Sequence, residues 1–327
     1  MKLVFCVQHP FSLWQVPEWV AERLRQEFPA LEVVLLHSYK GLEDAVADAD
    51  VLVAWSLRAE QFKAARKLRW IHSTTAAVHA LLIPEVVASD VVVTNSRNVH
   101  GPVVAEHAMA LIYALAKRLH VARDEQHKKR WAKDILWDSP ARPRELAGAT
   151  LVLVGLGAIG ENIARAAHAI GMHVIGVREH PNRGSRSVER VVGFDRLDSV
   201  LPLADFVVLA APLTDKTRGL FDAVRIGLLK PSAYLINVAR GDLLDSVALA
   251  TALREHHLAG AALDVFEEEP LPADSPLWEV EELLITPHSA ALTENLWERQ
   301  YDLLAENLKR FRAHRPLVGE VDKQKGY

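Results

Sequence analysis

The sequence predicts an α/β protein made of two doubly wound parallel-sheet domains, and two observations support this fold class. Short apolar segments alternate with amphipathic segments along most of the chain, which is the pattern of βαβ units whose strands are buried on both faces. A glycine-rich turn at residues 155–160 follows one of the apolar segments and opens a second series of them. Two series of this kind predict two sheets.

The first series predicts a smaller, flavodoxin-like domain. Five apolar segments are expected as strands, at 2–7, 31–37, 50–55, 69–74 and 91–96, with helices at 17–28 and 59–67 among them. A long amphipathic helix is expected at 292–314, where it would return to cover this domain. We therefore assign residues 1–98 and 293–327 to one domain, in which the substrate is expected to bind.

The second series predicts a complete Rossmann domain over residues 99–292. Six strands are expected, at 151–157, 173–177, 205–211, 233–239, 260–266 and 282–288, enough for a doubly wound dinucleotide-binding sheet. Before them, residues 101–125 begin with a Gly-Pro helix-start signal and are apolar nearly all round as far as Ala116. Such a helix needs burial on several sides, so we expect it at the domain junction and at a subunit interface.

Composition limits the partners that we expect. The 327 residues carry a formal net charge of -4, which provides no general attraction to nucleic acid or to an anionic membrane. Cys6 is the single cysteine, so no intrachain disulfide can form, as is usual in a reducing compartment. No apolar run approaches the roughly 18 residues of a membrane span. We expect a cytoplasmic protein with no nucleic-acid partner, no membrane partner and no metal site.

The glycine-rich turn predicts a dinucleotide site. Gly155 would allow the tight turn, Gly157 would let the backbone approach a pyrophosphate, and Gly160 would let the helix pack on the strand. The amides of Ala158 and Ile159 would open the helix and face the phosphates.

The segment after the second strand of this domain predicts which dinucleotide binds. Arg178 stands 18 residues after Gly160, where a ribose-binding acid is expected for NAD. A guanidinium instead suits the 2′-phosphate of NADP, and Arg183 and Arg186 in the same loop would add to it. We expect NADP, while Glu179 keeps NAD possible by taking over the ribose.

Polar residues follow three later strands of the second series. Arg240 ends one segment, Asp264 and Glu269 end the next, and His288 ends the last. Ligands of open α/β sheets bind outside the carboxyl ends of the strands, so we expect these side chains to share one site.

These segments resemble the D-isomer-specific 2-hydroxyacid dehydrogenases, a family that includes glyoxylate/hydroxypyruvate reductases, D-lactate dehydrogenases and phosphoglycerate dehydrogenases. The resemblance rests on "GLGAIG" (155–160), "LPLADFVVLAAPLTDKTRGLF" (201–221), "ARGD" (239–242), "DVFEEEP" (264–270) and "TPH" (286–288). It spans nearly all of the second domain and, more loosely, the first.

The resemblance implies a role for each polar residue. Arg240 would grip the substrate carboxylate with its planar fork. His288 would act as the general acid that protonates the keto oxygen. Glu269 would pair with His288, favour its charged form and fix its tautomer, and Asp264 would lie close to the nicotinamide amide.

The family pattern implies further contacts, some at positions where this chain departs from it. Cofactor contacts are expected at Pro212, Val238 and Ala239. In the first domain, backbone amides at Ala76 and Ala77 would help to bind the substrate carboxylate. The usual glycine is replaced by Ala77 and the usual aspartate by His79. Because alanine tolerates positive φ less well than glycine, the shape of this loop is left open.

Together these inferences predict an NAD(P)-dependent D-2-hydroxyacid dehydrogenase. We expect NADPH-dependent reduction of a small 2-keto acid such as glyoxylate or hydroxypyruvate, and a homodimer formed through the 101–120 helix. One alternative is an NAD-dependent enzyme like D-lactate or phosphoglycerate dehydrogenase. Another is a dinucleotide-sensing interaction protein like the transcriptional corepressors that resemble this family.

Overall fold

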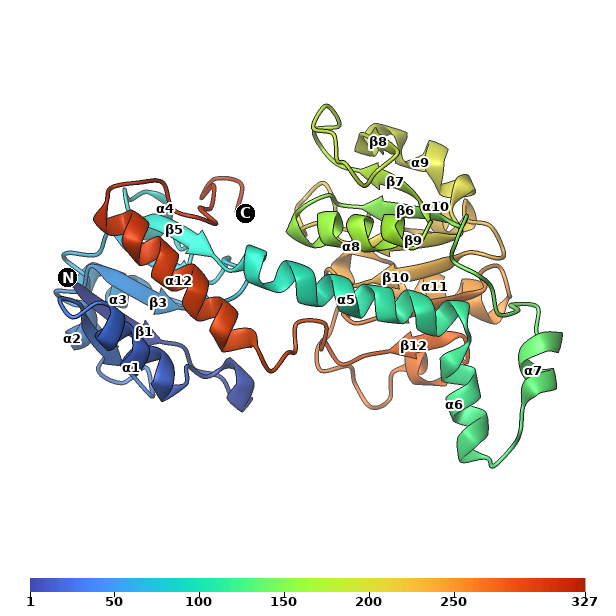
Figure 1. The fold of residues 1–327 in the computed structure, drawn as a ribbon, viewed down its shortest axis with the longest axis horizontal. Coiled ribbons are helices and arrows are strands. Elements are labelled where there is room, and N and C mark those ends of the chain that lie inside the picture. The colour runs from blue at the N-terminus through green and yellow to red at the C-terminus, as the bar shows by residue number, and fades with distance from the viewer. Residues whose placement is uncertain (327) are drawn as a thin grey trace. The chain divides into compact units, whose positions relative to one another are not determined.

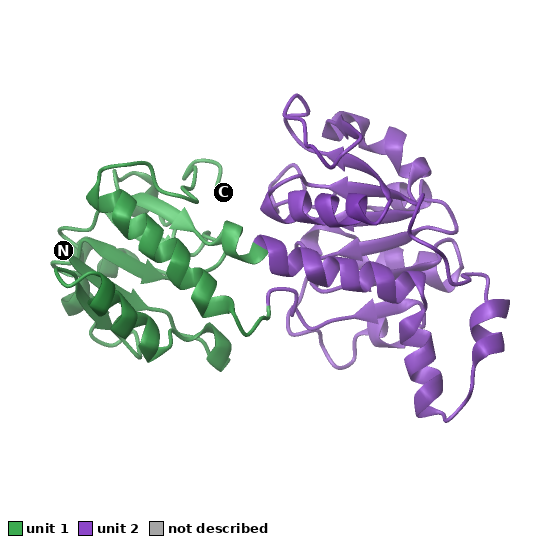
Figure 2. Cartoon of the chain, in the orientation of Figure 1, with its two compact units in different colours: residues 1–100, 292–327 green, residues 101–291 purple. Residues whose placement is uncertain are grey.

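The computed structural model describes residues 1–326. The chain divides into two compact units, shown in different colours in Figure 2. Unit 1 contains residues 1–100 and the chain from residue 292 onward, and unit 2 contains residues 101–291.

Unit 1 has a five-stranded parallel sheet with helices on both faces. The strands are β1 (Lys2–Cys6), β2 (Glu32–Leu35), β3 (Val51–Ala54), β4 (Trp70–Ser73) and β5 (Val92–Asn95), in the order β2-β1-β3-β4-β5. This order is that of flavodoxin-like sheets, and the predicted fold class is confirmed for this unit. The central strand β3 is completely buried, which explains why it is apolar without alternation. Its neighbour β4 is buried as well but carries the polar residues His72 and Ser73.

The helices of unit 1 complete two apolar cores, one on each face of the sheet. They are α1 (Glu18–Glu27), α2 (Leu42–Val46), α3 (Ala59–Ala64), α4 (Pro84–Val87) and α12 (Leu296–Arg312). As Figure 1 shows, α12 lies beside α1 on the same face of the sheet, although nearly the whole chain separates them in sequence. Tyr301, Leu304 and Leu308 of α12 join the core that contains Leu24 of α1. The C-terminal segment thus returns to the first unit.

Unit 2 has a parallel sheet with the order β12-β11-β10-β9-β6-β7-β8. Its strands are β6 (Thr150–Val154), β7 (His173–Val177), β8 (Arg190–Val192), β9 (Phe206–Leu209), β10 (Tyr234–Asn237), β11 (Gly260–Leu263) and β12 (Leu283–Ile285). The order is that of a Rossmann sheet with one more strand. The prediction of six strands was one short, because β8 is a three-residue edge strand in which only Val192 is buried.

The helices of unit 2 flank this sheet, apart from two that form an arm. They are α5 (Arg97–Ala116, beginning in unit 1), α6 (Leu119–His127), α7 (Lys133–Asp138), α8 (Ala158–Ala169), α9 (Leu197–Val200), α10 (Ala223–Gly227) and α11 (Ser246–Arg254). Short 3-10 helices occupy Ser12–Trp14, Phe194–Arg196, Leu201–Leu203, Gly241–Leu243 and Pro276–Glu279 of the chain. In Figure 1, α6 and α7 extend away from the body of unit 2.

The helix expected at 101–125 is two helices. The first, α5, begins four residues early because the carbonyl of Ser96 accepts the amides of Val99 and His100. It ends at Ala116, and Arg118 has a φ of 53° that turns the chain into α6. By length and composition α5 would suffice to span a membrane. However, 67% of its most apolar 18-residue stretch is buried within the protein, as in a core helix.

Candidate active site

The glycine-rich turn joins β6 to α8, and each of its glycines has a separate structural reason. Gly155 has a φ of 104°, and a Cβ there would lie 2.5 Å from the amide nitrogen of Ala211. A Cβ on Gly160 would lie 1.9 Å from the carbonyl oxygen of Gly155, so the helix packs directly on the turn. At Gly157 nothing lies within 4 Å of the Cβ position, which leaves open space beside the N-terminus of α8.

This arrangement fits the pyrophosphate of a dinucleotide. Gly157 is the N-cap of the twelve-residue helix α8, and its carbonyl accepts the amide of Glu161. Among the described residues, no protein acceptor pairs with the amides of Ala158 and Ile159. Unpaired amides and the positive end of the helix dipole favour a bound anion.

Arg178 follows β7 and lies against the same helix. Its Nη1 donates to the carbonyl of Arg183 at 3.2 Å and lies 3.5 Å from Oε1 of Glu161, in the first turn of α8. The side chain of Arg178 is only 21% exposed. Glu179 instead forms an ion pair with Lys216 at 2.9 Å. A guanidinium is therefore held beside the dinucleotide turn, while the neighbouring acid is engaged elsewhere.

The remaining cofactor positions lie at the carboxyl ends of neighbouring strands. Pro212 follows β9, and its carbonyl accepts the hydroxyl of Thr217 at 2.7 Å. Val238 and Ala239 follow β10, and Asn237 fixes this turn by accepting the amide of Ala239 at 3.0 Å. Since β10, β9 and β6 are adjacent in the sheet, these positions share an edge with the glycine-rich turn.

Glu269 and His288 are paired. Oε2 of Glu269 lies 2.6 Å from Nδ1 of His288, while Oε1 accepts the amide of Phe266 at 2.9 Å. Because an ionised carboxylate only accepts hydrogen bonds, the proton of the pair is placed on Nδ1. The imidazole is 48% exposed, so its Nε2 is the nitrogen that can exchange a proton with a ligand.

Asp264 holds the loop on which His288 stands. Its buried carboxylate accepts the hydroxyl of Thr286 at 2.6 Å and the amides of Ser289 and Ala290 at 2.9 and 3.0 Å. Its own carbonyl accepts the amide of His288 at 2.8 Å, and His288 has a φ of 50°. The sequence placed Asp264 near a nicotinamide; in the structure its carboxylate oxygens accept hydrogen bonds from the loop.

Sequence reasoning missed two members of this network. Thr286 stands two residues before His288 in "TPH", so the sequence already showed a hydroxyl donor next to an expected site residue. His107 lies on α5, with Nε2 3.2 Å from the Thr286 hydroxyl and 3.5 Å from Oδ1 of Asp264. Nothing in the local sequence connects His107 with these residues, because the contact depends on how α5 packs on the sheet.

Arg240 comes close to the Glu269 loop because the next residue is glycine. A Cβ on Gly241 would lie 2.0 Å from the backbone carbon of Phe266, so only glycine lets the two loops touch. Asn237 donates to the carbonyl of Arg240 at 2.8 Å. Burial lowers the pKa of the Arg240 guanidinium, and the charge of Glu269 opposes that shift. Arg240, Glu269 and His288 thus belong to one cluster.

The expected carboxylate-binding loop lies in unit 1, after β4. The carbonyl of Ala77 accepts the hydroxyls of Ser73 and Thr75 at 3.2 and 2.7 Å, and the carbonyl of Ala76 accepts Nδ2 of Asn95 at 2.9 Å. Neither alanine has a positive φ, so the missing glycine imposes no strain here. Among residues 1–326, no protein acceptor pairs with the amides of Ala76 and Ala77, as an anion-binding loop requires.

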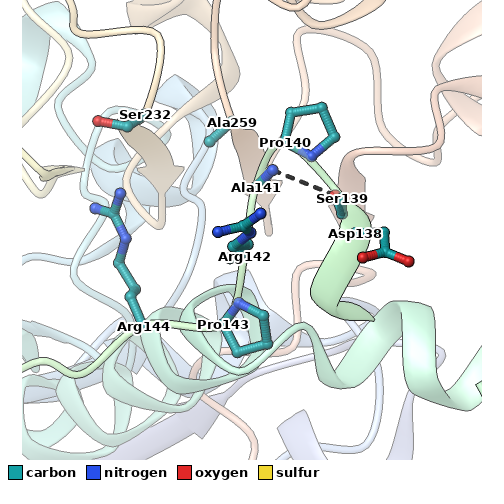
Figure 3. A pocket seen from close by; sticks show the side chains of 9 residues that line it. All are labelled: Asp138, Ser139, Pro140, Ala141, Arg142, Pro143, Arg144, Ser232 and Ala259. Carbon is teal, nitrogen blue, oxygen red and sulfur yellow. Dashed lines mark hydrogen bonds between the residues drawn. The ribbon is translucent and has the colours of Figure 1, made fainter. Parts of the chain in front are cut away.

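Unit 2 has a concavity with a volume of about 440 Å³ at the amino ends of its strands. Figure 3 shows its lining by Asp138, Ser139, Pro140, Ala141, Arg142, Pro143, Arg144, Ser232 and Ala259. Ser232 precedes β10 and Ala259 precedes β11, so this pocket faces the amino ends of the strands. The cluster of Arg240, Glu269 and His288 lies at their carboxyl ends, and the pocket is separate from it.

The described residues offer no metal centre, since residues 1–326 contain no group of three His, Cys, Asp or Glu side chains that could hold a metal ion. The chemistry available to the cluster is that of an anion-binding guanidinium beside a carboxylate–imidazole pair.

Comparison with known proteins identifies relatives of the chain. Residues 109–290, more than half of the chain, match the family model for the NAD binding domain of D-isomer specific 2-hydroxyacid dehydrogenases. A glyoxylate reductase of Korarchaeum cryptofilum is 33% identical over 84% of this chain and 83% of its own length. A D-3-phosphoglycerate dehydrogenase of Methanocaldococcus jannaschii is 32% identical over 89% of this chain but only 55% of its own length.

Two solved structures are similar over the whole chain. One is a D-isomer specific 2-hydroxyacid dehydrogenase of Xanthobacter autotrophicus in complex with NADPH, with a TM-score of 0.84, 29% identity and coverage of 100% of this chain and 99% of the other. The second is an NADPH-dependent glyoxylate/hydroxypyruvate reductase of Sinorhizobium meliloti in complex with NADP and sulfate, with a TM-score of 0.80, 28% identity and the same coverage.

Proposed function

The chain belongs to the D-isomer specific 2-hydroxyacid dehydrogenase family and is an NAD(P)-dependent enzyme, and on this basis we propose that it reduces glyoxylate or hydroxypyruvate with NADPH. The product is the corresponding D-2-hydroxy acid. The observation that carries the proposal is the cluster of Arg240, Glu269 and His288, because these groups match the needs of a 2-keto acid.

Each residue of the site has a separate role in the proposed reaction. Arg240 binds the substrate carboxylate and orients the adjacent carbonyl. The Nε2 atom of His288 donates a proton to the carbonyl oxygen, and Glu269 holds the ring at Nδ1 and stabilises the imidazolium. Ala76 and Ala77 supply backbone amides to the carboxylate. The turn of Gly155, Gly157 and Gly160 would hold the dinucleotide, which when bound would supply the hydride.

Arg178 supports NADPH as the preferred dinucleotide. Its guanidinium is held beside the first turn of α8 by the Arg183 carbonyl and Glu161, and a 2′-phosphate is the group of NADP that a guanidinium recognises. The acid that would favour NAD, Glu179, forms an ion pair with Lys216. In the second candidate function, an NAD-dependent enzyme, Glu179 leaves that pair and binds the ribose.

One assay tests the substrate class and the dinucleotide preference together. Purified enzyme is mixed with glyoxylate or hydroxypyruvate and with NADPH or NADH, and the absorbance of the reduced nicotinamide is followed. We expect kcat/KM with NADPH to be at least about tenfold higher than with NADH. Equal or better use of NADH would replace the NADPH assignment, and no turnover with any 2-keto acid would contradict the substrate assignment.

We also propose a cytoplasmic homodimer formed through α5 and the arm of α6 and α7. This region exposes large apolar side chains, namely Tyr113, Leu119, Trp131, Ile135 and Trp137, with Trp131 95% exposed. Apolar side chains gathered in this way are typical of protein interfaces. Sedimentation analysis should find a dimer, and Trp131→Ser with Trp137→Ser should shift it toward monomer.

A further inference from the structure

Unit 1 carries a group of aromatic side chains at the carboxyl edge of its sheet, which we call the aromatic edge. His9, Phe11 and Trp14 follow β1, Tyr39 follows β2, and Trp55 follows β3. These segments are far apart in sequence, but β2, β1 and β3 are neighbours in the sheet. Their carboxyl ends, which are the ligand-binding edge of such folds, therefore bring the rings together.

Three rings of the aromatic edge, those of His9, Trp14 and Trp55, are in contact through Trp55. The ring centroids of His9 and Trp55 are 5.3 Å apart at an interplanar angle of 61°, and those of Trp14 and Trp55 are 6.1 Å apart at 62°. Trp14 also meets His100, at 6.4 Å and 67°. Edge-to-face contacts of this kind keep aromatic rings in fixed orientations, so the surface is preformed.

Trp55 connects the aromatic edge to the carboxylate-binding loop. Its Nε1 donates to the hydroxyl of Thr74, two residues before Ala76. The carbonyl of Thr74 in turn accepts Nε2 of His100 at 3.2 Å and Nε2 of Gln300 at 2.7 Å. The indole is thus fixed beside the loop whose amides are proposed to hold the substrate carboxylate.

The aromatic edge remains partly exposed, which a purely structural cluster would not need. Among the described residues of unit 1, the exposed large apolar side chains are Phe11, Tyr39 and Leu292, and two of them belong to this edge. Phe11 is 47% exposed and Tyr39 is 39% exposed. Trp14 and Trp55 are also partly exposed, so four of the rings offer surface to a ligand.

We infer that the aromatic edge binds the side chain of the substrate and that the enzyme accepts 2-keto acids with an aromatic side chain. This inference rests on the proposed function, because it takes the carboxylate to be held at Ala76 and Ala77. A planar ring placed against Trp55 gains the edge-to-face or offset contacts that these rings already make with one another. Glyoxylate has no side chain, so it can gain nothing from the aromatic edge.

The test compares phenylpyruvate with glyoxylate for the whole enzyme and the same dinucleotide. We expect kcat/KM for phenylpyruvate to be at least as high as for glyoxylate. Trp55→Ala should lower the ratio of the two values about tenfold, Trp14→Ala should lower it less, and Trp55→Phe should restore most of it. The ratio removes any loss that both substrates share through a disturbed Thr74 loop.

Trp278→Ala is the matched control. This indole is 52% exposed and its Nε1 donates to the carbonyl of Pro272 at 2.8 Å, so like Trp55 it is a surface indole with a hydrogen-bonded Nε1, but it lies in unit 2 away from the aromatic edge. The substrate ratio of this variant should equal that of the parent enzyme.

Two results would overturn the inference while leaving the proposed function intact. One is reduction of glyoxylate without reduction of phenylpyruvate. The other is a ratio that neither Trp55→Ala nor Trp14→Ala changes. Failure of the parent enzyme with every 2-keto acid, glyoxylate included, would instead reject the proposed function and this inference with it.

Discussion

The hydroxyl of Thr286 donates a hydrogen bond of 2.6 Å to the carboxylate of Asp264. This contact, with the two loop amides that share the same carboxylate, determines where His288 stands. Asp264 is thus a positioning residue for the proton donor, and the following prediction separates that role from a cofactor contact.

Asp264→Asn should lower kcat about a hundredfold, because an amide offers one acceptor oxygen where the loop presents four donors, and a misplaced His288 loses its alignment. Thr286→Val should lower kcat less, since it removes one of the four bonds. The Kd for NADPH, measured by fluorescence titration, should stay within about threefold of the parent value. A large rise in Kd with little change in kcat would show that Asp264 acts on the nicotinamide instead.

Glu269→Gln should lower kcat by about 10²–10⁴-fold, the usual contribution of general acid–base catalysis. An amide cannot supply the negative charge that stabilises the imidazolium of His288, whose Nδ1 lies 2.6 Å away. Glu268→Gln is the matched control, because Glu268 is an exposed neighbour in the same acidic run. Steady-state kinetics in which both variants lose activity equally would contradict the pairing.

Gly241→Ala should destabilise the enzyme by about 1–3 kcal/mol, the cost of overpacking. The added Cβ would lie 2.0 Å from the backbone carbon of Phe266, so the Arg240 and Glu269 loops must separate. Activity should fall with the melting temperature. Gly227→Ala has open space at its Cβ position and should leave both nearly unchanged.

Arg178→Asp should reverse the dinucleotide preference. The carboxylate would repel a 2′-phosphate and accept hydrogen bonds from a ribose hydroxyl, so kcat/KM should fall for NADPH and rise for NADH. Their ratio should change about a hundredfold. Arg196→Asp, which changes an exposed arginine that precedes α9, serves as the control. An unchanged ratio in Arg178→Asp would remove this residue from cofactor selection.

His72 should make the free energy of unfolding depend on pH. Burial lowers the pKa of His72 to about 4, whereas an unfolded histidine titrates near 6.5. Between these pH values the unfolded chain binds a proton that the native state excludes. The free energy of unfolding is therefore undiminished above about pH 6.5 and falls as the pH is lowered toward about 4. The decrease is at most about 1.4 kcal/mol per pH unit.

Denaturant unfolding at several pH values tests this prediction. His72→Gln should flatten the pH dependence over that interval, although His100, whose pKa burial also lowers, should retain part of it. His79→Gln changes an exposed histidine of the same unit and should leave the slope unchanged. An unaltered slope in His72→Gln would show that another group dominates.

The sequence by itself determined the fold class and the identities of the groups in the cluster. Buried parallel strands are continuous apolar runs, and Arg240, His288 and the loop that carries Glu269 each follow such a run, so the pattern places them at one edge of a sheet. The same local logic predicts the glycine-rich turn, because Gly155 and Gly160 meet backbone requirements that only glycine satisfies.

The tertiary structure decided the contacts between segments that are distant in sequence, which no local pattern encodes. Whether Asp264 faces a ligand or the His288 loop depends on the path of residues 286–290, and the contact of His107 with Thr286 depends on how α5 packs on the sheet. The edge strand β8 escaped prediction because its three residues are stabilised by pairing with β7 rather than by their own apolar pattern. Aromatic residues from separate loops form one edge only because β2, β1 and β3 are neighbours. Contacts between distant segments follow from chain packing, and packing is a property of the whole fold.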